Sequence, residues 1–152
     1  MKFELYHPMM STNYTLDWLT QTPLKQVKAA LPSQSSMTAT AQQINQAMQL
    51  IMHNQALIWG ITHRQTKTFC GIVRLDISPD QQATLKFSYR QQTLTLAAQL
   101  EIIAYLAAFT FKQLKLQRFV VNTANSAVGL RRQLLTQNYS PSKEKIYLIK
   151  NK

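Results

Sequence analysis

Residues 83–122 read ATLKFSYRQQTLTLAAQLEIIAYLAAFTFKQLKLQRFVVN, and this stretch decides the fold. It predicts a strand, a polar loop, a long helix and a second strand. Leu96, Leu100 and Ile103 recur at helical spacing, and the opposite face is also apolar, so we expect the helix to be buried against a sheet. Anions often bind where a loop meets a helix start, because free N–H groups and the helix dipole point there. The loop before this helix contains no glycine.

The segments on either side extend this unit into a sheet. ALIWGITH, TFCGIVRLDI and ATLKFSYR are strand candidates separated by the short polar segments RQTK and SPDQQ, which predicts an antiparallel meander. After the long helix, RFVVN predicts a buried strand, SAVGLRRQLLTQ an amphipathic helix and EKIYLIK a closing strand.

The amino-terminal third gives weaker patterns. We expect a short strand over residues 3–6 and helical structure from Asn13 to Leu31, interrupted at Pro23. Thr40 and Gln43 have the spacing of a capping box, which predicts the start of an amphipathic helix there. The fold class is therefore α/β (α+β), a single domain over residues 1–152 with a central, mostly antiparallel mixed sheet flanked by helices.

Composition limits the cellular setting. The chain is 45% hydrophobic, has no apolar run as long as a membrane span and begins without the apolar stretch of a signal peptide, so we expect no membrane segment and a cytoplasmic location. Cys70 is the only cysteine, so no internal disulfide forms, and its apolar surroundings predict a core residue.

The chain is strongly basic. Its 17 Lys and Arg residues against 6 Asp and Glu residues give a formal net charge of +11, which attracts nucleic acid, an anionic surface or a phosphorylated cofactor. The basic residues are scattered without aromatic residues between them, which does not favour a dedicated nucleic-acid interface.

The stretch from Ala56 to Tyr139 resembles the GNAT family of acyl-CoA-dependent N-acetyltransferases, and most closely the branch that acetylates ribosomal-protein amino termini. The alignment with that branch has no gap. The branch's strand corresponds to ATLKF, and its cofactor loop with the helix start corresponds to LTLAAQLEI. The helix end, the following strand and the final helix correspond to FKQLKL, RFVVN and ANSAVGLRRQLLTQNY. Trp59, Gly71 and Asp76 are in register with the preceding hairpin of the family.

The departures from the family lie at positions of chemistry. The family has Gln/Arg-Gly-x-Gly before the helix, where this chain has Leu94-Thr95-Leu96-Ala97, a degenerate acetyl-CoA motif. Thr95 either crowds the phosphates of the cofactor or caps the helix with its hydroxyl. A family acidic residue corresponds to Thr84, which cannot act as a general base near neutral pH. The family's Asn and Ser correspond to Ala127 and Leu130.

The resemblance implies an acetyl-CoA-dependent N-acetyltransferase that transfers an acetyl group to an amine, with a protein amino terminus as one candidate acceptor. Acetyl-CoA is the implied cosubstrate, and the amine attacks its thioester directly in a ternary complex. The implied cofactor-binding residues lie on the strand end, the helix start and the later loop: Phe87, Ser88, Tyr89, Thr95, Leu96, Ala97, Ala98, Gln99 and Asn125.

The catalytic acid and base stay unassigned. His7, His53 and His63 do not cluster, and no spacing of ligands predicts a metal site. His63 is a candidate base with a solvated turn residue as the alternative reading, and Arg131 and Arg132 either meet the cofactor phosphates or lie on a solvated helix face.

Two other hypotheses stay open. One is a GNAT-fold protein without catalysis that serves in binding or regulation, and the other is a basic nucleic-acid or ribosome-binding module. Neither the acceptor nor the oligomeric state can be derived from the sequence.

Overall fold

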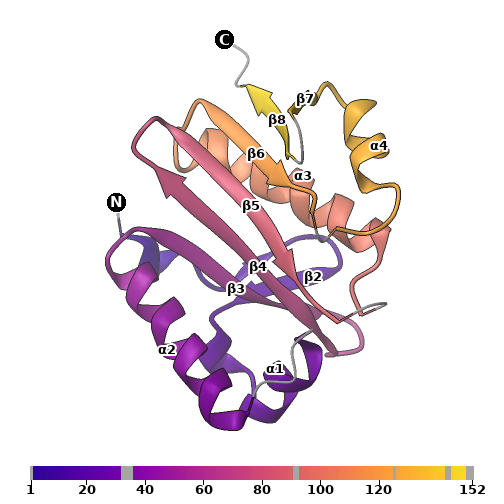
Figure 1. Ribbon diagram of the computed structural model, residues 1–152. Coiled ribbons are helices and arrows are strands. Elements are labelled where there is room, and N and C mark those ends of the chain that lie inside the picture. Colours follow the sequence, from indigo (N-terminus) through magenta and orange to yellow (C-terminus); the bar gives the residue numbers. More distant parts are fainter. Residues whose placement is uncertain (1, 32–35, 91–92, 125, 143–144, 150–152) are drawn as a thin grey trace. The chain divides into compact units, whose positions relative to one another are not determined.

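The computed structural model describes residues 2–31, 36–90, 93–124, 126–142 and 145–149 (Figure 1). The chain forms two compact units. Unit 1 comprises Met1–Arg74 and Phe87–Leu94, and unit 2 comprises Leu75–Lys86 and Thr95–Lys152. The strands β4 (Phe69–Ser78) and β5 (Gln82–Ser88) each contribute residues to both units.

The eight strands have the hydrogen-bonded order β1-β2-β3-β4-β5-β6-β8-β7. The only parallel pairing among those with a described register joins β5 to β6, and β1–β2, β2–β3, β6–β8 and β7–β8 are antiparallel. The predicted fold class, a mixed α/β fold with a mostly antiparallel sheet flanked by helices, is confirmed.

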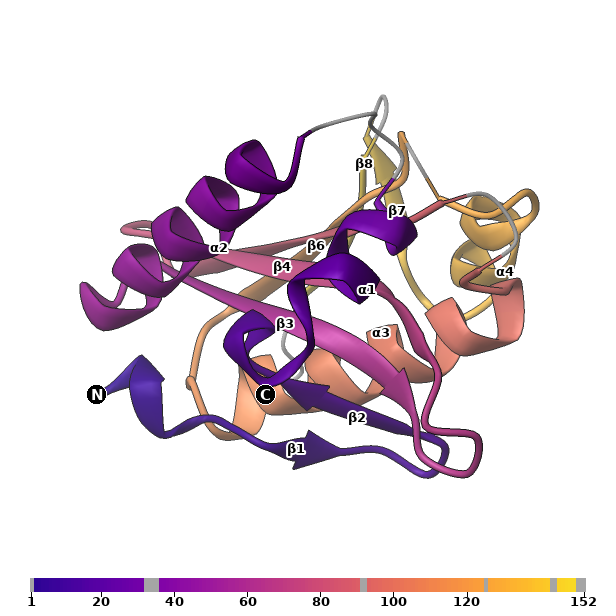
Figure 2. The ribbon, with the colours of Figure 1, turned by 90° about the horizontal axis from the view of Figure 1, so that it is seen from below.

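Unit 1 begins with a short 3-10 helix, η1 (Phe3–Leu5), and continues through β1 (Met9–Met10), β2 (Tyr14–Asp17), a second 3-10 turn η2 (Leu19–Gln21) and the helix α1 (Leu24–Ala30). The longer helix α2 (Met37–Met52) then leads to β3 (Ala56–His63). The helices α1 and α2 lie side by side, and α2 runs along β3 (Figure 2).

Three amino-terminal predictions were wrong in detail. Residues 3–6 include a 3-10 helix instead of a strand. Residues 14–17 form a strand instead of a helix, because they pair with β3 from Tyr14↔His63 to Asp17↔Gly60 and this tertiary pairing outweighs local preference. The helix α2 begins at Met37, and its cap is Ser36, whose hydroxyl accepts a hydrogen bond from the N–H of Ala39 at 3.1 Å.

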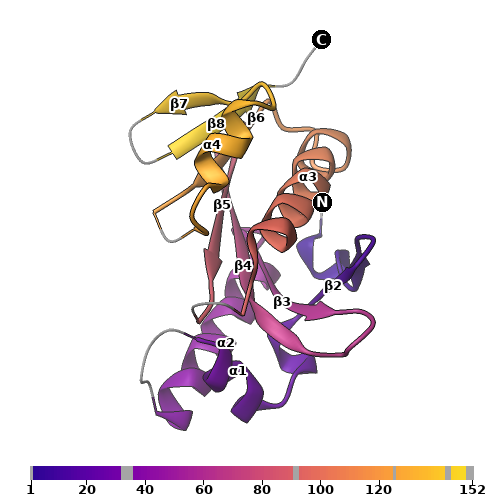
Figure 3. The same cartoon turned by 90° about the vertical axis from the view of Figure 1, so that its right-hand side faces the viewer.

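Unit 2 is built on the predicted strand–helix–strand segment. Buried side chains lie on nearly every turn of α3 (Leu96–Lys112), as expected, and α3 contacts β6 (Arg118–Asn122). The helix α4 (Leu130–Leu135) contacts α3 and β8 (Lys145–Ile149), and β8 pairs with β7 (Ser140–Ser142) (Figure 3). The predicted helix over SAVGLRRQLLTQ is shorter than expected, because Gly129 adopts φ +88° just before Leu130.

The outermost strands are both short. β1 has two residues and follows Pro8, and β7 has three residues with Pro141 at its centre. Proline has no N–H to donate to a neighbouring strand.

Candidate functional site

The start of α3 is capped by Thr95. This residue has extended backbone angles (φ −72°, ψ 166°), and its Oγ1 accepts a hydrogen bond from the N–H of Ala98 at 3.2 Å. Its carbonyl oxygen accepts the N–H of Gln99 at 3.0 Å. Of the two roles open to Thr95 from the sequence, the structure therefore shows the cap, and the side chain is directed at its own helix.

Two N–H groups remain available beside this cap. In the part of the chain that the structure describes, the N–H groups of Leu96 and Ala97 donate no hydrogen bond. The side chain of Ala97 is exposed and that of Leu96 is half-buried. Unpaired N–H groups in a first helical turn attract anions, because they lie at the positive end of the helix dipole.

Ala98 and Gln99 have buried side chains. Gln99 is fully buried, and its Oε1 accepts the N–H of Ala127 at 3.0 Å. This bond joins the first turn of α3 to the turn that precedes α4. Sequence reasoning placed Gln99 among the cofactor-binding residues without seeing this bond. The sequence does contain one sign of such a buried hydrogen bond, because Gln99 is a neutral polar residue on a helix face that is otherwise apolar.

The turn after β6 is held by its own side chains. Asn122 Oδ1 accepts the N–H of Ala124 at 3.1 Å, and the Ser126 hydroxyl donates to the carbonyl oxygen of Thr123 at 2.8 Å. Leu130, at the position of the family's serine, is fully buried. Asn125, the remaining residue expected to bind the cofactor, lies outside the described residues.

The strand end Phe87–Tyr89 belongs to unit 1. The described pairs of β5 with β6 end at Leu85↔Val121, while β5 itself continues to Ser88. Phe87 is 2% exposed, whereas Ser88 and Tyr89 are half-buried. Main-chain groups beyond the last pair with β6 are the kind that bind a linear amide-bearing ligand by strand-like hydrogen bonds.

Gly71 in β4 lies close against this strand end. A Cβ atom at Gly71 would lie 2.8 Å from Cβ of Tyr89 and 3.0 Å from the carbonyl oxygen of Ser88. Arg90 anchors the same end to α1, because its N–H donates to the Ala30 carbonyl oxygen at 2.6 Å and its guanidinium donates to the Leu31 carbonyl oxygen at 3.3–3.4 Å. The segment is thus held by close contact on one side and by hydrogen bonds on the other.

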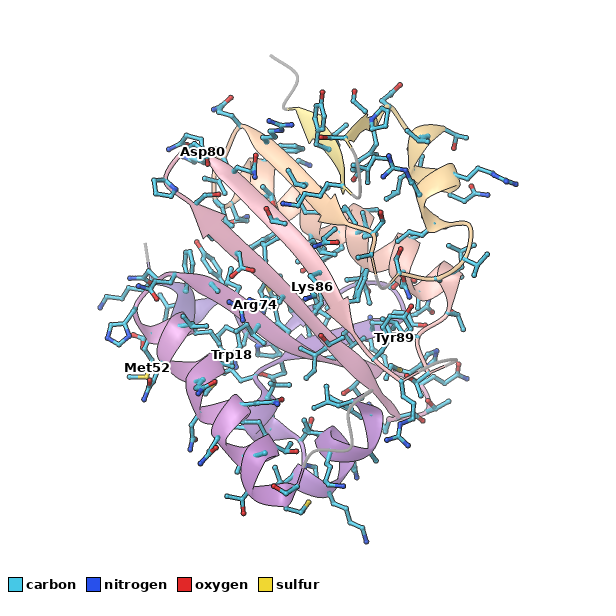
Figure 4. The ribbon with its side chains drawn as sticks, in the orientation of Figure 1. Trp18, Met52, Arg74, Asp80, Lys86 and Tyr89 are labelled. Carbon is cyan, nitrogen blue, oxygen red and sulfur yellow. The ribbon has the colours of Figure 1, made fainter. Side chains whose placement is uncertain are left out.

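Unit 1 also contains a pocket of about 250 Å³. Its walls come from α1 and α2 and from β3, β4 and the end of β5, and they include Ile44, Ile58, Ile72, Arg74 and Ser88. Arg74 lies on β4 and Tyr89 follows β5 (Figure 4). Sequence reasoning missed this pocket, because its lining residues are spread from Leu19 to Ser88.

The three histidines occupy three different settings in unit 1, and His53 Nδ1 lies 2.8 Å from the Gln49 carbonyl oxygen at the end of α2. The Nδ1 atom of His63 accepts the N–H groups of Gln65 and Thr66 at 3.2 and 3.3 Å, so this nitrogen is committed to the turn that follows β3. His7 Nδ1 lies 2.7 Å from Asp17 Oδ1, and the His7 ring lies 4.7 Å from the Trp18 ring. No sequence pattern predicted this pair, which depends on the pairing of β1 with β2.

Four further side chains have structural roles, and all of them are buried: Trp18, Trp59, Cys70 and Tyr139. Trp18 and Trp59 are buried and stacked, with ring centroids 6.2 Å apart. Burial raises the pKa of the Cys70 thiol, which favours the protonated, unreactive form. Tyr139 is buried against Phe119. Among the described residues, no group of three His, Cys, Asp or Glu side chains is placed to hold a metal, and no helix has the length and apolarity needed to cross a membrane.

No known family model matches the sequence, and no curated protein matches it significantly. Solved structures do match. A proposed ribosomal-protein-serine acetyltransferase from Vibrio cholerae has a TM-score of 0.75 at 17% identity, covering 94% of this chain and 97% of its own. A GNAT-family acetyltransferase from Bacillus anthracis has a TM-score of 0.67 at 8% identity, covering 93% and 98%.

A third match is the microcin C7 self-immunity acetyltransferase MccE, solved with acetyl-CoA and AMP. It has a TM-score of 0.63 at 10% identity, covering 91% of this chain and 93% of its own. At such identities the likeness concerns the fold, and the chain has the fold of GNAT acetyltransferases.

Proposed function

We propose that this chain is an acetyl-CoA-dependent N-acetyltransferase that transfers an acetyl group to an amine, and that residues 1–152 act as one GNAT-like domain. The observation that carries the proposal is the fold, shared over 94% of the chain with a proposed ribosomal-protein acetyltransferase. An accessible start of α3 agrees with it, because Thr95 and Ala97 are exposed.

The phosphates of acetyl-CoA would be bound by the first turn of α3. The N–H groups of Leu96 and Ala97 supply donors, and Thr95 keeps the turn formed. The side chains of Ala98 and Gln99 are buried, so any contact of these two residues with the cosubstrate would be through the main chain. The missing glycines therefore remove close backbone approach but not the hydrogen-bond donors.

The pantetheine arm would pair with the main chain of Phe87–Tyr89. Such contacts use backbone groups and tolerate sequence change, and Gly71 and Arg90 hold this strand end in place. Acetyl-CoA supplies the activated acetyl group, and binding an amine beside it provides proximity, which accounts for a large part of the rate in such reactions. The amine of a protein amino terminus is one candidate acceptor.

The test is titration calorimetry with acetyl-CoA, followed by mass spectrometry of amine acceptors incubated with the protein. Leu96→Pro is a sharp probe, because Thr95 already has the extended backbone that a following proline requires and the lost N–H belongs to no helical bond. We expect Leu96→Pro to weaken acetyl-CoA binding about tenfold, since one hydrogen bond to a charged group is lost. Leu96→Ala controls for loss of the side chain. An absence of wild-type binding at millimolar acetyl-CoA would refute the proposal.

A GNAT-fold protein without catalysis is the second candidate. It is favoured by the lack of an acidic residue at Thr84 and by the buried Leu130 at the family's serine position. Under this reading acetyl-CoA still binds, and no amine in a broad screen is acetylated. Turnover of any acceptor above the uncatalysed rate excludes it.

A further inference from the structure

Another hollow in unit 1 lies where two turns meet. The turn between β1 and β2 ends beside the turn between β3 and β4 (Figure 2). Arg64 joins them, because its N–H donates to the Asn13 carbonyl oxygen at 2.8 Å. Its Nη1 atom also donates to the carbonyl oxygens of Ser11 and Thr12 at 2.9 and 3.2 Å. A hollow of about 460 Å³ opens at this junction, with walls from β1, β2 and both turns, and we call it the turn hollow.

Basic side chains line the turn hollow, and among the described residues no acidic one does. His63 ends β3, and Arg64 and Lys67 follow in the turn to β4. Arg64 and Lys67 are exposed, and His63 is half-buried. Unit 1 has only two acidic residues, Glu4 and Asp17, and neither lines the hollow. Two cations on one turn repel each other, and a bound anion relieves that repulsion.

Each of these three side chains has a donor to offer. The Nη1 atom of Arg64 is used by the β1–β2 turn, but its Nε and Nη2 groups donate no hydrogen bond in the described part of the chain. The Lys67 ammonium has no hydrogen bond or ion pair with another described residue. His63 Nδ1 accepts the N–H groups of Gln65 and Thr66, so the neutral ring carries its proton on Nε2. The remaining donors all suit an anionic ligand.

The backbone at Lys67 adds an independent observation. This residue adopts φ +61°, a left-handed conformation that costs conformational energy for most residues other than glycine. Its N–H donates to the His63 carbonyl oxygen at 2.9 Å, which closes the turn. Glycine would form the same turn without that cost. The turn itself is therefore served better by glycine, and the presence of lysine points to a role for its side chain.

The placement of the donors favours one compact anion. A phosphate group bound through a single ester bond has three acceptor oxygens and a charge of about −1.5 to −2 at neutral pH, which suits several donors around one point. A nucleic acid presents a row of phosphates, whereas these basic residues all lie within residues 63–67. The volume of about 460 Å³ falls within the usual range for small-molecule sites, so the body of a small ligand also fits.

We infer that the turn hollow binds a phosphate dianion, with Arg64, Lys67 and the Nε2–H group of His63 as its donors. Free phosphate and a phosphorylated small molecule present the same chemistry, and the experiment below distinguishes them. The inference does not rest on the proposed acetyl transfer, because none of these residues belongs to the segments expected to bind acetyl-CoA.

The test is amide NMR on the full chain, titrated at constant ionic strength so that general screening of charge does not change. The amides of Gln65 and Thr66 report from the turn, since both donate to His63 Nδ1. The amide of Ala97 reports from the start of α3, where the proposed function places the cosubstrate phosphates. The probes are inorganic phosphate, glycerol 3-phosphate, glycerol and a short uridine oligonucleotide without a terminal phosphate.

We expect both phosphates to shift the two turn amides and glycerol to leave them unchanged. The tighter binder of the two phosphates identifies the source of the dianion. Lys67→Gly should weaken its binding about fivefold, because one charged hydrogen-bond donor is lost. The same variant should keep Tm within about 2 °C of wild type, because glycine suits φ +61°. Lys67→Asn, whose side chain also tolerates this backbone, repeats the test in a second variant. Lys67→Arg retains the charge and should retain binding. Lys25→Gln removes a positive charge from an exposed position on α1 and should bind as wild type.

Several results would overturn the inference. One is an absence of turn-amide shifts with either phosphate at about 20 mM. Another is wild-type affinity in folded Lys67→Gly and Lys67→Asn. Tighter binding of the oligonucleotide, compared at equal phosphate concentration, would assign the hollow to nucleic acid instead. Shifts confined to Ala97 would place phosphate at the start of α3, which contradicts this inference and supports the proposed function.

Discussion

The role of Thr95 can be tested by three substitutions that separate a helix cap from an obstruction. Thr95→Ala deletes the hydroxyl that accepts the Ala98 N–H at 3.2 Å, Thr95→Ser retains it, and Thr95→Gly removes the whole side chain from the helix start. Loss of a capping hydroxyl costs about 1 kcal/mol when alanine replaces it and only a few tenths when glycine does. In a protein of this length, 1 kcal/mol lowers Tm by about 2–4 °C.

We therefore expect Thr95→Ala to lower the free energy of unfolding by about 1 kcal/mol, with Thr95→Ser close to wild type and Thr95→Gly between the two. Urea unfolding and thermal melts measure this order. Calorimetry with acetyl-CoA measures the second consequence. Because the side chain is directed at its own helix, Thr95→Gly should leave the affinity for acetyl-CoA within about twofold of wild type. A tenfold gain in affinity for Thr95→Gly, together with an unchanged stability of Thr95→Ala, would refute the cap and establish Thr95 as an obstruction.

Three further predictions concern the stability of the fold. Gly71→Ala should destabilise the fold by about 1–3 kcal/mol in urea unfolding, because the new Cβ overlaps Tyr89; a wild-type midpoint would contradict this. Gln99→Ala should cost about 1–3 kcal/mol, because the Ala127 N–H loses its acceptor, and hydrogen exchange at that amide should accelerate. Burial raises the pKa of Tyr139 to about 12 from an ordinary 10.0, so the native state keeps a proton that the unfolded chain loses. Ionisation of this tyrosine should therefore leave the free energy of unfolding unchanged below pH 10. It should lower that free energy by about 2–3 kcal/mol between pH 10 and 12. Tyr139→Phe should abolish this loss of unfolding free energy. An identical loss in the variant would show that other groups cause it.

The sequence predicted best where local period and burial agree. The meander β3–β4–β5, the helix α3 and the strand β6 occur within one or two residues of their expected bounds, because their apolar patterns are long and unambiguous. The prediction of a helix over Tyr14–Asp17 was wrong for the opposite reason. Four residues carry too little pattern to outweigh a helical reading, and only the partner strand β3 decides their conformation.

The sequence predicted which segments form the candidate site, but not the contacts between residues that are distant in the chain. The family resemblance placed Thr95 at the helix start, and capping was one of two roles that its chemistry allowed. The bond from Gln99 to Ala127 spans 28 positions in the chain, and the pocket around Arg74 draws on residues from Leu19 to Ser88. Such groupings are set by tertiary packing, and a single sequence read along its length gives no signal for them.

The brevity of β1 and β7 bears on how this protein behaves at high concentration. A strand of two residues and a strand of three around Pro141 offer almost no ladder onto which another polypeptide can add. With a formal charge of +11, copies of the chain also repel one another. Fibril growth by strand addition is thus opposed both by geometry and by electrostatics, so concentrated solutions for calorimetry and NMR should stay free of such aggregates.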